Sequence, residues 1–532
     1  MMRMTRLSRL LTTSRRGLAT TAAGATRRRA IEKFGAPSSI QSIPDDSVLL
    51  EKKRNYELPN AFIGNLGCAR RVFLLDPSLN ATELEGLAYR LKLLTRNEGL
   101  SAILIGSDSP KYAGEADYKN SEGLPLADSV LDREDRERYA AWEYAEDPLP
   151  PEPGKTWLVS SGYDPLSLYK RGEHRQEAVV NHLFDSLQDL ARSIRGVAGA
   201  KVPTITVPHG QIADAGAVFL NASYVLATHE SSFRIHNPGR GLTFDPVGLS
   251  YLLPRLGREF KQPSANFPGC SLILGLMGYE ASADDMMETG LATNFMDDYQ
   301  GMINLEEALT EMPPWNQQAL TKKPIRYYND PEPTRDHNAE FRNVAVADLV
   351  HSLSAYRADG ADFWEHGYDD HKLTDPSLDF VDAVPDFGFR ESDLVNYAAT
   401  FHNIFYYEKS VQGILERFRE IAGRTSNDPE EQEGITVAKD FVERMERQSP
   451  LALCVTYRLL WLGQLKDETM ETCMARERKA QTKLLGMADF EQWGRHQTRD
   501  RPEGDKIELF TGWKHKSVAD VTDDEVAEVL GL

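Results

Sequence analysis

Apolar and polar positions in the first part of the chain follow two different periods. Residues 71–75 and 101–106 are short apolar runs, typical of buried strands. Between them, residues 79–94 carry leucines three or four positions apart, which is the period of a helix with one buried face. A strand, a helix and a second strand in this order predict a layered α/β domain.

The same kind of pattern returns after an interruption. Residues 118–172 are rich in Asp, Glu, Pro, Gly and Tyr and show no sustained period, which favours a long surface insertion. Residues 173–194 then have a helical period, and residues 203–207 and 224–227 are strand-like. The α/β pattern therefore continues on the far side of the insertion.

The last third of the chain has a helical pattern. Long helix-like segments occupy residues 339–357, 392–423, 435–464 and 466–487. The sequence thus predicts an α/β core in residues 61–335, interrupted by the insertion at 118–172, followed by a mainly helical region in residues 336–532.

The first 30 residues differ from the rest of the chain. They contain eight arginines and many Ser, Thr and Ala residues, and no acidic residue occurs before Glu32. Helical spacing separates arginines from leucines, which is typical of a mitochondrial presequence. The alternative is a basic arm that binds nucleic acid. Residues 31–60 contain three prolines and are predicted to form an extended lead-in.

Composition narrows the class of protein. A chain of 532 residues with 41% hydrophobic and 27% charged residues is typical of a globular protein with more than one folded region. No apolar run reaches the length of a membrane span. The four cysteines have no CxxC spacing, so neither a disulfide framework nor a structural zinc site is expected.

The charge of the chain restricts its partners. The formal net charge is −20, and without the eight N-terminal arginines it becomes −28. Such an acidic body repels phosphate backbones. Proteins are therefore more favourable partners than nucleic acids.

Short motifs also occur in a fixed order. They are the strand and Pro-x-x-Asn-Ala type helix start at 71–81, Tyr-Ala-Gly with a following Asp at 112–117, Pro-His-Gly at 208–210, Phe-Asp and Leu-Pro-Arg-Leu within 244–256, Gly-Leu-Ala-Thr at 290–293, Ser-Pro at 449–450, Asp-Phe at 489–490 and Gly-Trp-Lys at 512–514. In this order they resemble the 3-hydroxyisobutyryl-CoA hydrolase subgroup of the enoyl-CoA hydratase/isomerase (crotonase) superfamily. The last three motifs resemble the tail of that subgroup, which ordinary hydratases lack. The resemblance implies a crotonase-like strand–helix spiral core with a mainly helical C-terminal region.

The resemblance also implies a chemistry for particular positions. Members of the superfamily bind a CoA thioester with its carbonyl oxygen in a hole formed by two backbone N–H groups, which stabilise the developing oxyanion. In the hydrolase a glutamate acts on the acyl carbonyl or its attacking water, and a nearby aspartate assists. The equivalent positions here are Gly114, Glu115, Asp214 and Ala215 for the oxyanion hole, and Asn237 and Asp245 for the two catalytic acids.

Several of these positions depart from the pattern of the family. Glu115 follows Gly114 where the resemblance requires a second glycine, and Asp214 stands in the glycine run, where its carboxylate would oppose an oxyanion. Asn237 replaces the glutamate, and an amide has no basicity near neutral pH. Only Asp245 is kept. The sequence therefore predicts a site that no longer hydrolyses thioesters efficiently.

Two alternatives remain for the catalytic base. If the alignment is shifted by a residue, Asp214 or Glu115 serves as the acid in place of Asn237. Alternatively, His236 acts as a new base.

Hydrolase-like proteins of this subgroup also occur in the small subunit of the mitochondrial ribosome in fungi and plants. The resemblance therefore implies a structural component of that subunit in the mitochondrial matrix. Its partners would be mitochondrial ribosomal proteins, with at most a minor rRNA contact, docked through residues 31–60 and 118–172. No cofactor, metal or membrane is expected.

The competing interpretation is an active enzyme of the mitochondrial matrix. It would be a 3-hydroxyisobutyryl-CoA hydrolase of valine catabolism, or a related acyl-CoA hydratase, with a CoA ester as its substrate. An enzyme of specialised metabolism is disfavoured by the presequence.

Overall fold

The computed structural model describes two main blocks of the chain and a few residues between them. The described residues are 61–107 without 67, 75–77 and 96–99; 158–312 without 196–201, 257–267 and 297; six residues between 346 and 357; and 392–499 and 510–532. The expected presequence (1–30), the lead-in (31–60), residues 118–157 of the insertion and the boundary between 335 and 336 lie outside them.

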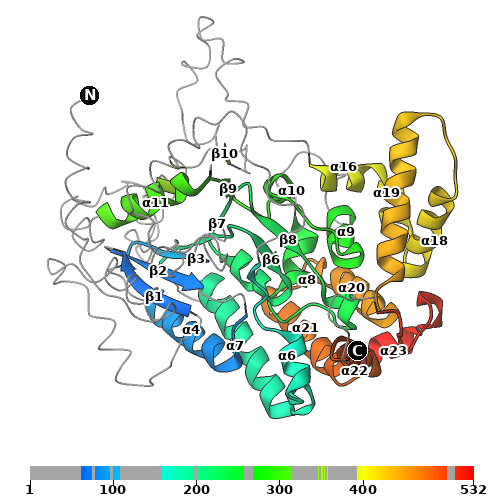
Figure 1. Ribbon diagram of the computed structural model, residues 1–532, viewed down its shortest axis with the longest axis horizontal. Helices are drawn as coiled ribbons and strands as arrows, with labels where there is room; N and C mark the ends of the chain where they lie inside the picture. The colour runs from blue at the N-terminus through cyan, green and yellow to red at the C-terminus, as the bar shows by residue number, and fades with distance from the viewer. Residues whose placement is uncertain are drawn as a thin grey trace, which may run out of the picture.

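A seven-stranded sheet forms the centre of the first block (Figure 1). In spatial order its strands are β1 (Ala61–Leu66), β2 (Ala69–Leu74), β3 (Ile103–Ser107), β5 (Thr204–Val207), β7 (Tyr224–Ala227), β9 (Asn294–Phe295) and β10 (Tyr356–Arg357). The pairs at the two edges, β1–β2 and β9–β10, are antiparallel, and the inner pairs are parallel. A second, parallel sheet contains β4 (Leu158–Ser160), β6 (Gln211–Ala213) and β8 (Ser232–Arg234).

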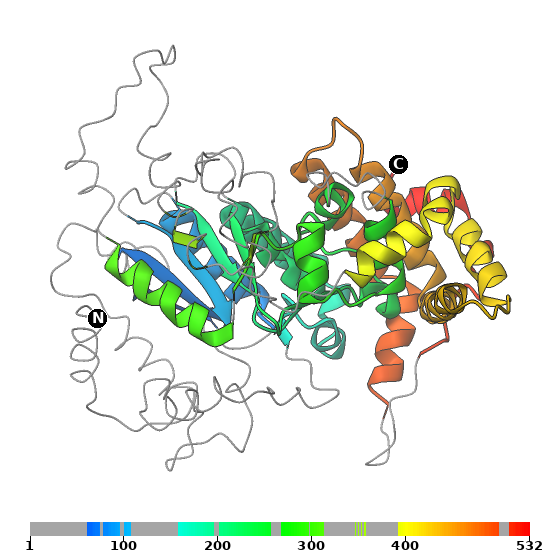
Figure 2. The same ribbon diagram turned by 90° about the horizontal axis from the view of Figure 1, so that it is seen from above.

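Helices cover both faces of the large sheet. They are α4 (Ala81–Leu94) and α7 (Glu177–Arg195) on one face and α11 (Asp298–Glu311) on the other (Figures 1 and 2). Side chains alternate along a strand, and in β3 Ile105 packs with the leucines of α4 and α7, whereas Leu104 packs with Leu305 of α11. This two-sided burial explains why the strand reads as a continuous apolar run.

Local signals determine where α4 begins. The side chain of Asn80 accepts a hydrogen bond from the backbone N–H of Glu83, and the Glu83 carboxylate accepts one from the N–H of Asn80. This capping box satisfies two backbone donors at the helix start.

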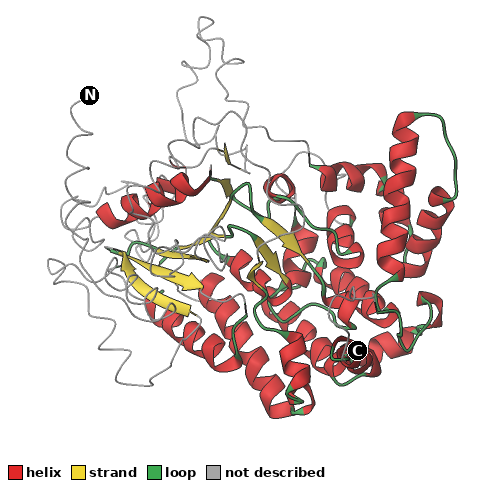
Figure 3. Ribbon diagram, viewed as in Figure 1, coloured by secondary structure: helices red, strands yellow, loops and turns green. Residues whose placement is uncertain are grey.

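The second block is helical and packs beside the small sheet (Figure 3). Its helices are α16 (Asp393–Thr400), α17 (His402–Tyr407), α18 (Val411–Ala422), α19 (Pro429–Glu446), α20 (Pro450–Gly463), α21 (Met470–Leu485), α22 (Ala488–Gln497) and α23 (Asp523–Leu530). Between the blocks lie α8 (Leu249–Leu252), α9 (Gly269–Met277) and α10 (Ala283–Thr289). One hydrophobic cluster includes residues of both blocks. The predicted α/β core with a mainly helical C-terminal region is confirmed. No helix within the described residues is long and apolar enough to cross a membrane.

Several predicted element bounds were wrong. Strand β1 lies ahead of the first apolar run that the pattern singled out, and the pattern did not mark it as a strand. Residues 158–172, assigned to the insertion, contain β4 and the short helix α6 (Pro165–Lys170), which starts where Asp164 caps its backbone N–H groups.

The predicted C-terminal helices are also shorter than expected. Residues 392–423 form three helices. The segment 435–464 is divided because the Ser449 side chain caps a new helix that begins at Pro450.

Candidate functional site

The two positions expected to hold the catalytic acids lie together. β8 leads into a short 3-10 helix, η4 (Asn237–Arg240), which ends at Gly241 with a φ of 76°, and the chain then turns back through Asp245. The Asn237 side-chain amide donates hydrogen bonds of 2.8 Å to the Thr243 carbonyl oxygen and to Asp245 Oδ2. The amide is therefore held as a donor to the carboxylate. It does not face outward as a base would.

The Asp245 carboxylate is enclosed by protein donors. Its Oδ1 accepts hydrogen bonds from the Tyr163 hydroxyl at 2.7 Å and from Gln481 Nε2 at 3.0 Å. Asp245 and Asn237 are each 1% exposed, and Tyr163 is 3% exposed. Three donors thus bind the carboxylate at the position that the resemblance assigns to the assisting aspartate.

Burial dominates the electrostatics of this carboxyl group. It raises the pKa of Asp245 to about 6, while the hydrogen bonds from Tyr163, Asn237 and Gln481 act in the opposite direction. Burial, together with the neighbouring Asp245 charge, raises the pKa of the Tyr163 hydroxyl well above its usual value. The phenol therefore stays protonated and remains a donor.

Asp214 is held by a different set of partners. It is buried, and its backbone has a φ of 48°, a left-handed conformation that suits the glycine expected there by the resemblance and that Asp tolerates better than most residues. Its Oδ1 accepts the backbone N–H groups of His236 at 2.6 Å and Asn237 at 3.0 Å, and its Oδ2 accepts Arg240 Nη1 at 2.8 Å.

These partners decide the charge state of Asp214. Burial alone would raise its pKa, but the Arg240 charge and the hydrogen bond from His236 outweigh burial and lower the pKa to about 2. The carboxylate therefore serves as a charged anchor for the start of η4 and is neutralised within the protein. It is not available as an acid near neutral pH.

His236 lies beside this anchor. Its Nδ1 is 3.4 Å from Asp214 Oδ2, and its side chain is 30% exposed. The arrangement places an imidazole next to a buried carboxylate at the entrance to η4, so His236 remains a candidate base by position. Glu115, the other alternative acid, lies outside the described residues.

The oxyanion-hole positions are only partly described. Ala215 is fully buried in the 3-10 helix η3 (Asp214–Asn221), whereas Gly114 lies outside the described residues, as Glu115 does. The segment that contacts Ala215 is the turn after β4. A Cβ atom on Gly162, whose φ is 73°, would lie 2.5 Å from the Cβ of Ala215. The two backbone segments lie so close together here that only glycine fits at position 162.

The same two segments also lie close together at Ser160 and Gly216. A Cβ atom on Gly216 would lie 2.0 Å from the Ser160 carbonyl oxygen, and β4 pairs with β6 in parallel just ahead of this point. Residues 160–164 therefore form one wall of the candidate site, although the sequence pattern assigned them to the insertion.

The C-terminal block supplies a further part of the site. On α21, Gln481 Oε1 accepts the Thr243 N–H at 2.9 Å, and Glu477, one turn earlier, accepts the N–H groups of Gly248 at 2.8 Å and Ser250 at 2.6 Å. Burial raises the pKa of Glu477 to about 7. The sequence analysis missed both side chains. Their signal was the presence of Glu and Gln on the otherwise apolar face of a helix.

The donor sets of the site do not suggest a metal. No cluster of His, Cys, Asp and Glu side chains suited to a metal ion occurs among the described residues. The four cysteines, three of them buried, are unpaired.

Comparison with known proteins identifies the family of this chain. A family model described as enoyl-CoA hydratase/isomerase matches residues 155–366 and 381–530, which together are more than half of the chain. The chain belongs to the enoyl-CoA hydratase/isomerase family. A comparison with curated proteins gave no significant match.

A solved structure shares the fold of this chain, and a second is similar to it. A carnitinyl-CoA dehydratase from Mycobacterium thermoresistibile has 14% sequence identity and a TM-score of 0.52, covering 88% of this chain and 96% of its own. An enoyl-CoA hydratase from Rhodobacter sphaeroides 2.4.1 has 16% identity and a TM-score of 0.48, covering 88% and 97%. At such identities the likeness concerns the fold alone.

The enoyl-CoA hydratase/isomerase match also bears on the oxyanion loop. It begins at residue 155 and so includes residues 158–164 but not 112–117. Within 158–164, Gly162 and Asp164 have the spacing of the first Gly and the Asp in the Ala-Gly-Gly-Asp loop, and Gly162 is the residue that contacts Ala215. Tyr163 stands between them, at the spacing of the second glycine. The residue that binds the Asp245 carboxylate thus lies in a segment with the spacing of this loop.

Proposed function

We propose that this chain is a catalytically inactive relative of 3-hydroxyisobutyryl-CoA hydrolase that serves as a structural component of the small subunit of the mitochondrial ribosome. The main support for catalytic inactivity is the environment of the Asp245 carboxylate. This carboxylate is buried and bound by Tyr163, Asn237 and Gln481.

Catalysis by this family's chemistry requires groups that the site lacks. A general base must lie within hydrogen-bond reach of the proton it removes, in a space that the substrate enters. Asn237 cannot accept that proton, and Asp214, with its pKa near 2, is paired with Arg240. The Tyr163 hydroxyl is bound to Asp245, and its ring packs edge-on against Phe184, with ring centroids 6.4 Å apart. Neither Asn237 nor Asp214 is therefore a free base, and the Asp245 carboxylate is enclosed by protein donors.

The ribosomal part of the proposal rests on the sequence. An arginine-rich segment free of acidic residues favours import into mitochondria. The chain keeps the packed core of the family while its catalytic positions have changed, and this combination is expected if the surface has become the functional part. The acidic body favours contacts with ribosomal proteins over contacts with rRNA.

Sedimentation of lysed mitochondria tests this proposal directly. The chain should travel with the small subunit on a sucrose gradient at low salt and after a moderate increase in salt. Protein contacts lose less affinity with salt than phosphate contacts, whose affinity falls steeply as counterions compete. A soluble matrix enzyme and a protein of the small subunit serve as markers. Recovery of the chain only in the top fractions under both conditions rejects the ribosomal role.

The second candidate is an active hydrolase. It is favoured by the pKa of Asp245, raised to about 6, and by the short separation of His236 and Asp214, since perturbed carboxyl groups are common in active sites. The purified full chain should then hydrolyse 3-hydroxyisobutyryl-CoA with a turnover in the usual range of about 1–1000 per second. Our proposal predicts no measurable turnover.

A further inference from the structure

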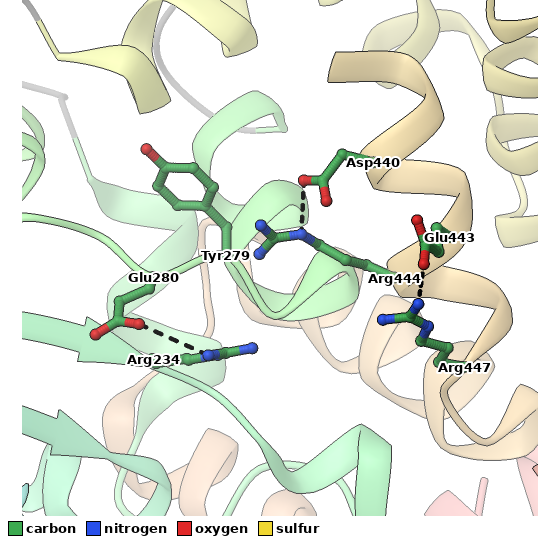
Figure 4. Close-up of a pocket in the computed structure, with 7 residues that line it drawn as sticks. All are labelled: Arg234, Tyr279, Glu280, Asp440, Glu443, Arg444 and Arg447. Carbon is green, nitrogen blue, oxygen red and sulfur yellow. Dashed lines mark hydrogen bonds and ion pairs between the residues drawn. The ribbon is translucent and has the colours of Figure 1, made fainter. Parts of the chain in front are cut away.

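A polar pocket opens between β8, the turn before α10, and α19 (Figure 4). Its volume is about 450 Å³, within the range of roughly 300–1000 Å³ that small-molecule sites occupy. It is lined by Arg234, Tyr279, Glu280, Asp440, Glu443, Arg444 and Arg447. None of the residues around Asp245 lines it, so it is separate from the candidate site described above.

One wall of the pocket carries an arginine with few partners. Arg234 meets Glu280 only at 3.6 Å, which is an ion pair too long for a hydrogen bond. Glu280 is bound elsewhere, because its Oε1 accepts hydrogen bonds from Gln211 at 2.6 Å and Ser232 at 2.9 Å. The Nε atom of Arg234 is buried and has no hydrogen-bond partner among the described residues. The terminal nitrogens of Arg234 also make no hydrogen bond with the described residues, so they have N–H donors left for a ligand.

The opposite wall presents two more guanidinium groups from α19. Arg444 uses its Nε atom to meet Asp440 at 2.6 Å, and its terminal nitrogens point across the pocket toward Tyr279 (Figure 4). Arg447 pairs through one terminal nitrogen with Glu443. These two acids are more exposed than the arginines that they pair with, so they lie toward the rim. The Tyr279 hydroxyl is bound to Asp285, 3.1 Å away, and does not compete for a ligand.

We propose that this pocket binds a small anion that presents two or more oxygen atoms, either carboxylate or phosphate, between Arg234 and Arg444. Guanidinium groups recognise such oxygens through paired, charge-assisted hydrogen bonds. The lining holds three arginines and three carboxylates, so its net charge attracts no ion from a distance. Recognition depends instead on the unused donors that converge from two walls.

Calorimetric titration of the full chain at low ionic strength tests the site. The probes are inorganic phosphate, pyrophosphate and succinate, in a buffer that contains neither phosphate nor carboxylate groups. The pocket variants are Arg234→Gln and Arg444→Gln. The matched control is Arg417→Gln, which removes a more exposed arginine of α18 that is paired with Glu408 and Glu420 outside the pocket. Arg234 makes no hydrogen bond with the part of the chain that the structure describes, so its variant should melt as the wild type does.

We expect saturable binding of at least one probe with one site per chain. Each pocket variant should weaken it about tenfold or more, as expected for the loss of a hydrogen bond to a charged group, and Arg417→Gln by less than about twofold. Preference for the phosphates or for succinate then shows whether the ligand presents phosphate or carboxylate oxygens. The proposal is overturned if no probe binds saturably to the wild type, or if the pocket variants bind as tightly as the control.

Discussion

Replacing Tyr163 with phenylalanine tests the enclosure of Asp245 with the smallest possible change. The variant keeps the ring and its packing against Phe184 but removes the hydroxyl that donates to Asp245 Oδ1 at 2.7 Å. Gln481 and Asn237 remain as donors. The carboxylate thus loses one of three hydrogen bonds and gains no access to water.

The cost of this change depends on pH. Above the Asp245 pKa of about 6 the group is charged, and the lost bond should lower the free energy of unfolding by about 1.5–3 kcal/mol. At pH 5 the carboxyl group is mainly protonated in the folded state, and the loss should be about 0.5–1.5 kcal/mol.

The difference between the folded and unfolded pKa of Asp245 determines how the stability of the wild type changes with pH. The folded pKa lies above the unfolded one, so the Asp245 contribution to stability is present at low pH and is lost as pH rises from about 4 to 6. Because the Tyr163 hydrogen bond lowers the pKa, its removal should raise the pKa and extend this loss to higher pH.

Urea unfolding at pH 5 and pH 8 measures both effects. The shift in midpoint, multiplied by an unchanged slope, gives the change in free energy. Tyr169→Phe is the matched control, since the structure records no hydrogen bond of the Tyr169 hydroxyl among the described residues. Equal losses at the two pH values, or a loss at pH 8 no larger than that of the control, would refute the enclosure of a charged Asp245.

Three other outcomes can be checked. Asn237→Glu alone should not produce hydrolysis of 3-hydroxyisobutyryl-CoA, because Tyr163 still covers Asp245; a thioester assay showing about one turnover per second or more would sink this expectation. Burial raises the pKa of Glu477 to about 7, so the wild type should lose stability between about pH 4.5 and 7, and Glu477→Gln should flatten that slope; urea midpoints that keep the wild-type slope would contradict it. The mature chain should begin near residue 31, as N-terminal sequencing of protein from mitochondria would show, and retention of Met1 or Met2 there would count against import by a cleaved presequence.

Sequence patterns located the elements that depend on local periodicity. The helix expected at 173–194 corresponds to α7, and the strand expected at 203–207 corresponds to β5, because buried faces repeat every 3.6 or 2 residues. The helical segment at 435–464 was misjudged because both of its parts are helical and only a short break at the Ser449 cap separates them.

The candidate site was harder to predict because its contacts are distant in sequence. Asn237 and Asp245 are eight residues apart in the sequence and are joined by a hydrogen bond. Tyr163 and Gln481 reach the same carboxylate from positions 82 and 236 residues away, and nothing in their spacing reveals this. β4 has only three residues and its partner is β6, more than fifty positions later, so the wall that it forms could not be recognised by period.

The hydrogen bonds between α21 and the turn at residues 243–250 have a consequence for the order in which the chain folds. The backbone N–H groups of Thr243, Gly248 and Ser250 are bound by Gln481 and Glu477, which leave the ribosome, or enter an organelle, more than two hundred residues later. Until they arrive, this turn is exposed to water and has no fixed geometry. The core of the protein therefore stays incompletely folded until almost the entire chain is available. During that time its apolar surface is exposed, and a chaperone can prevent its aggregation.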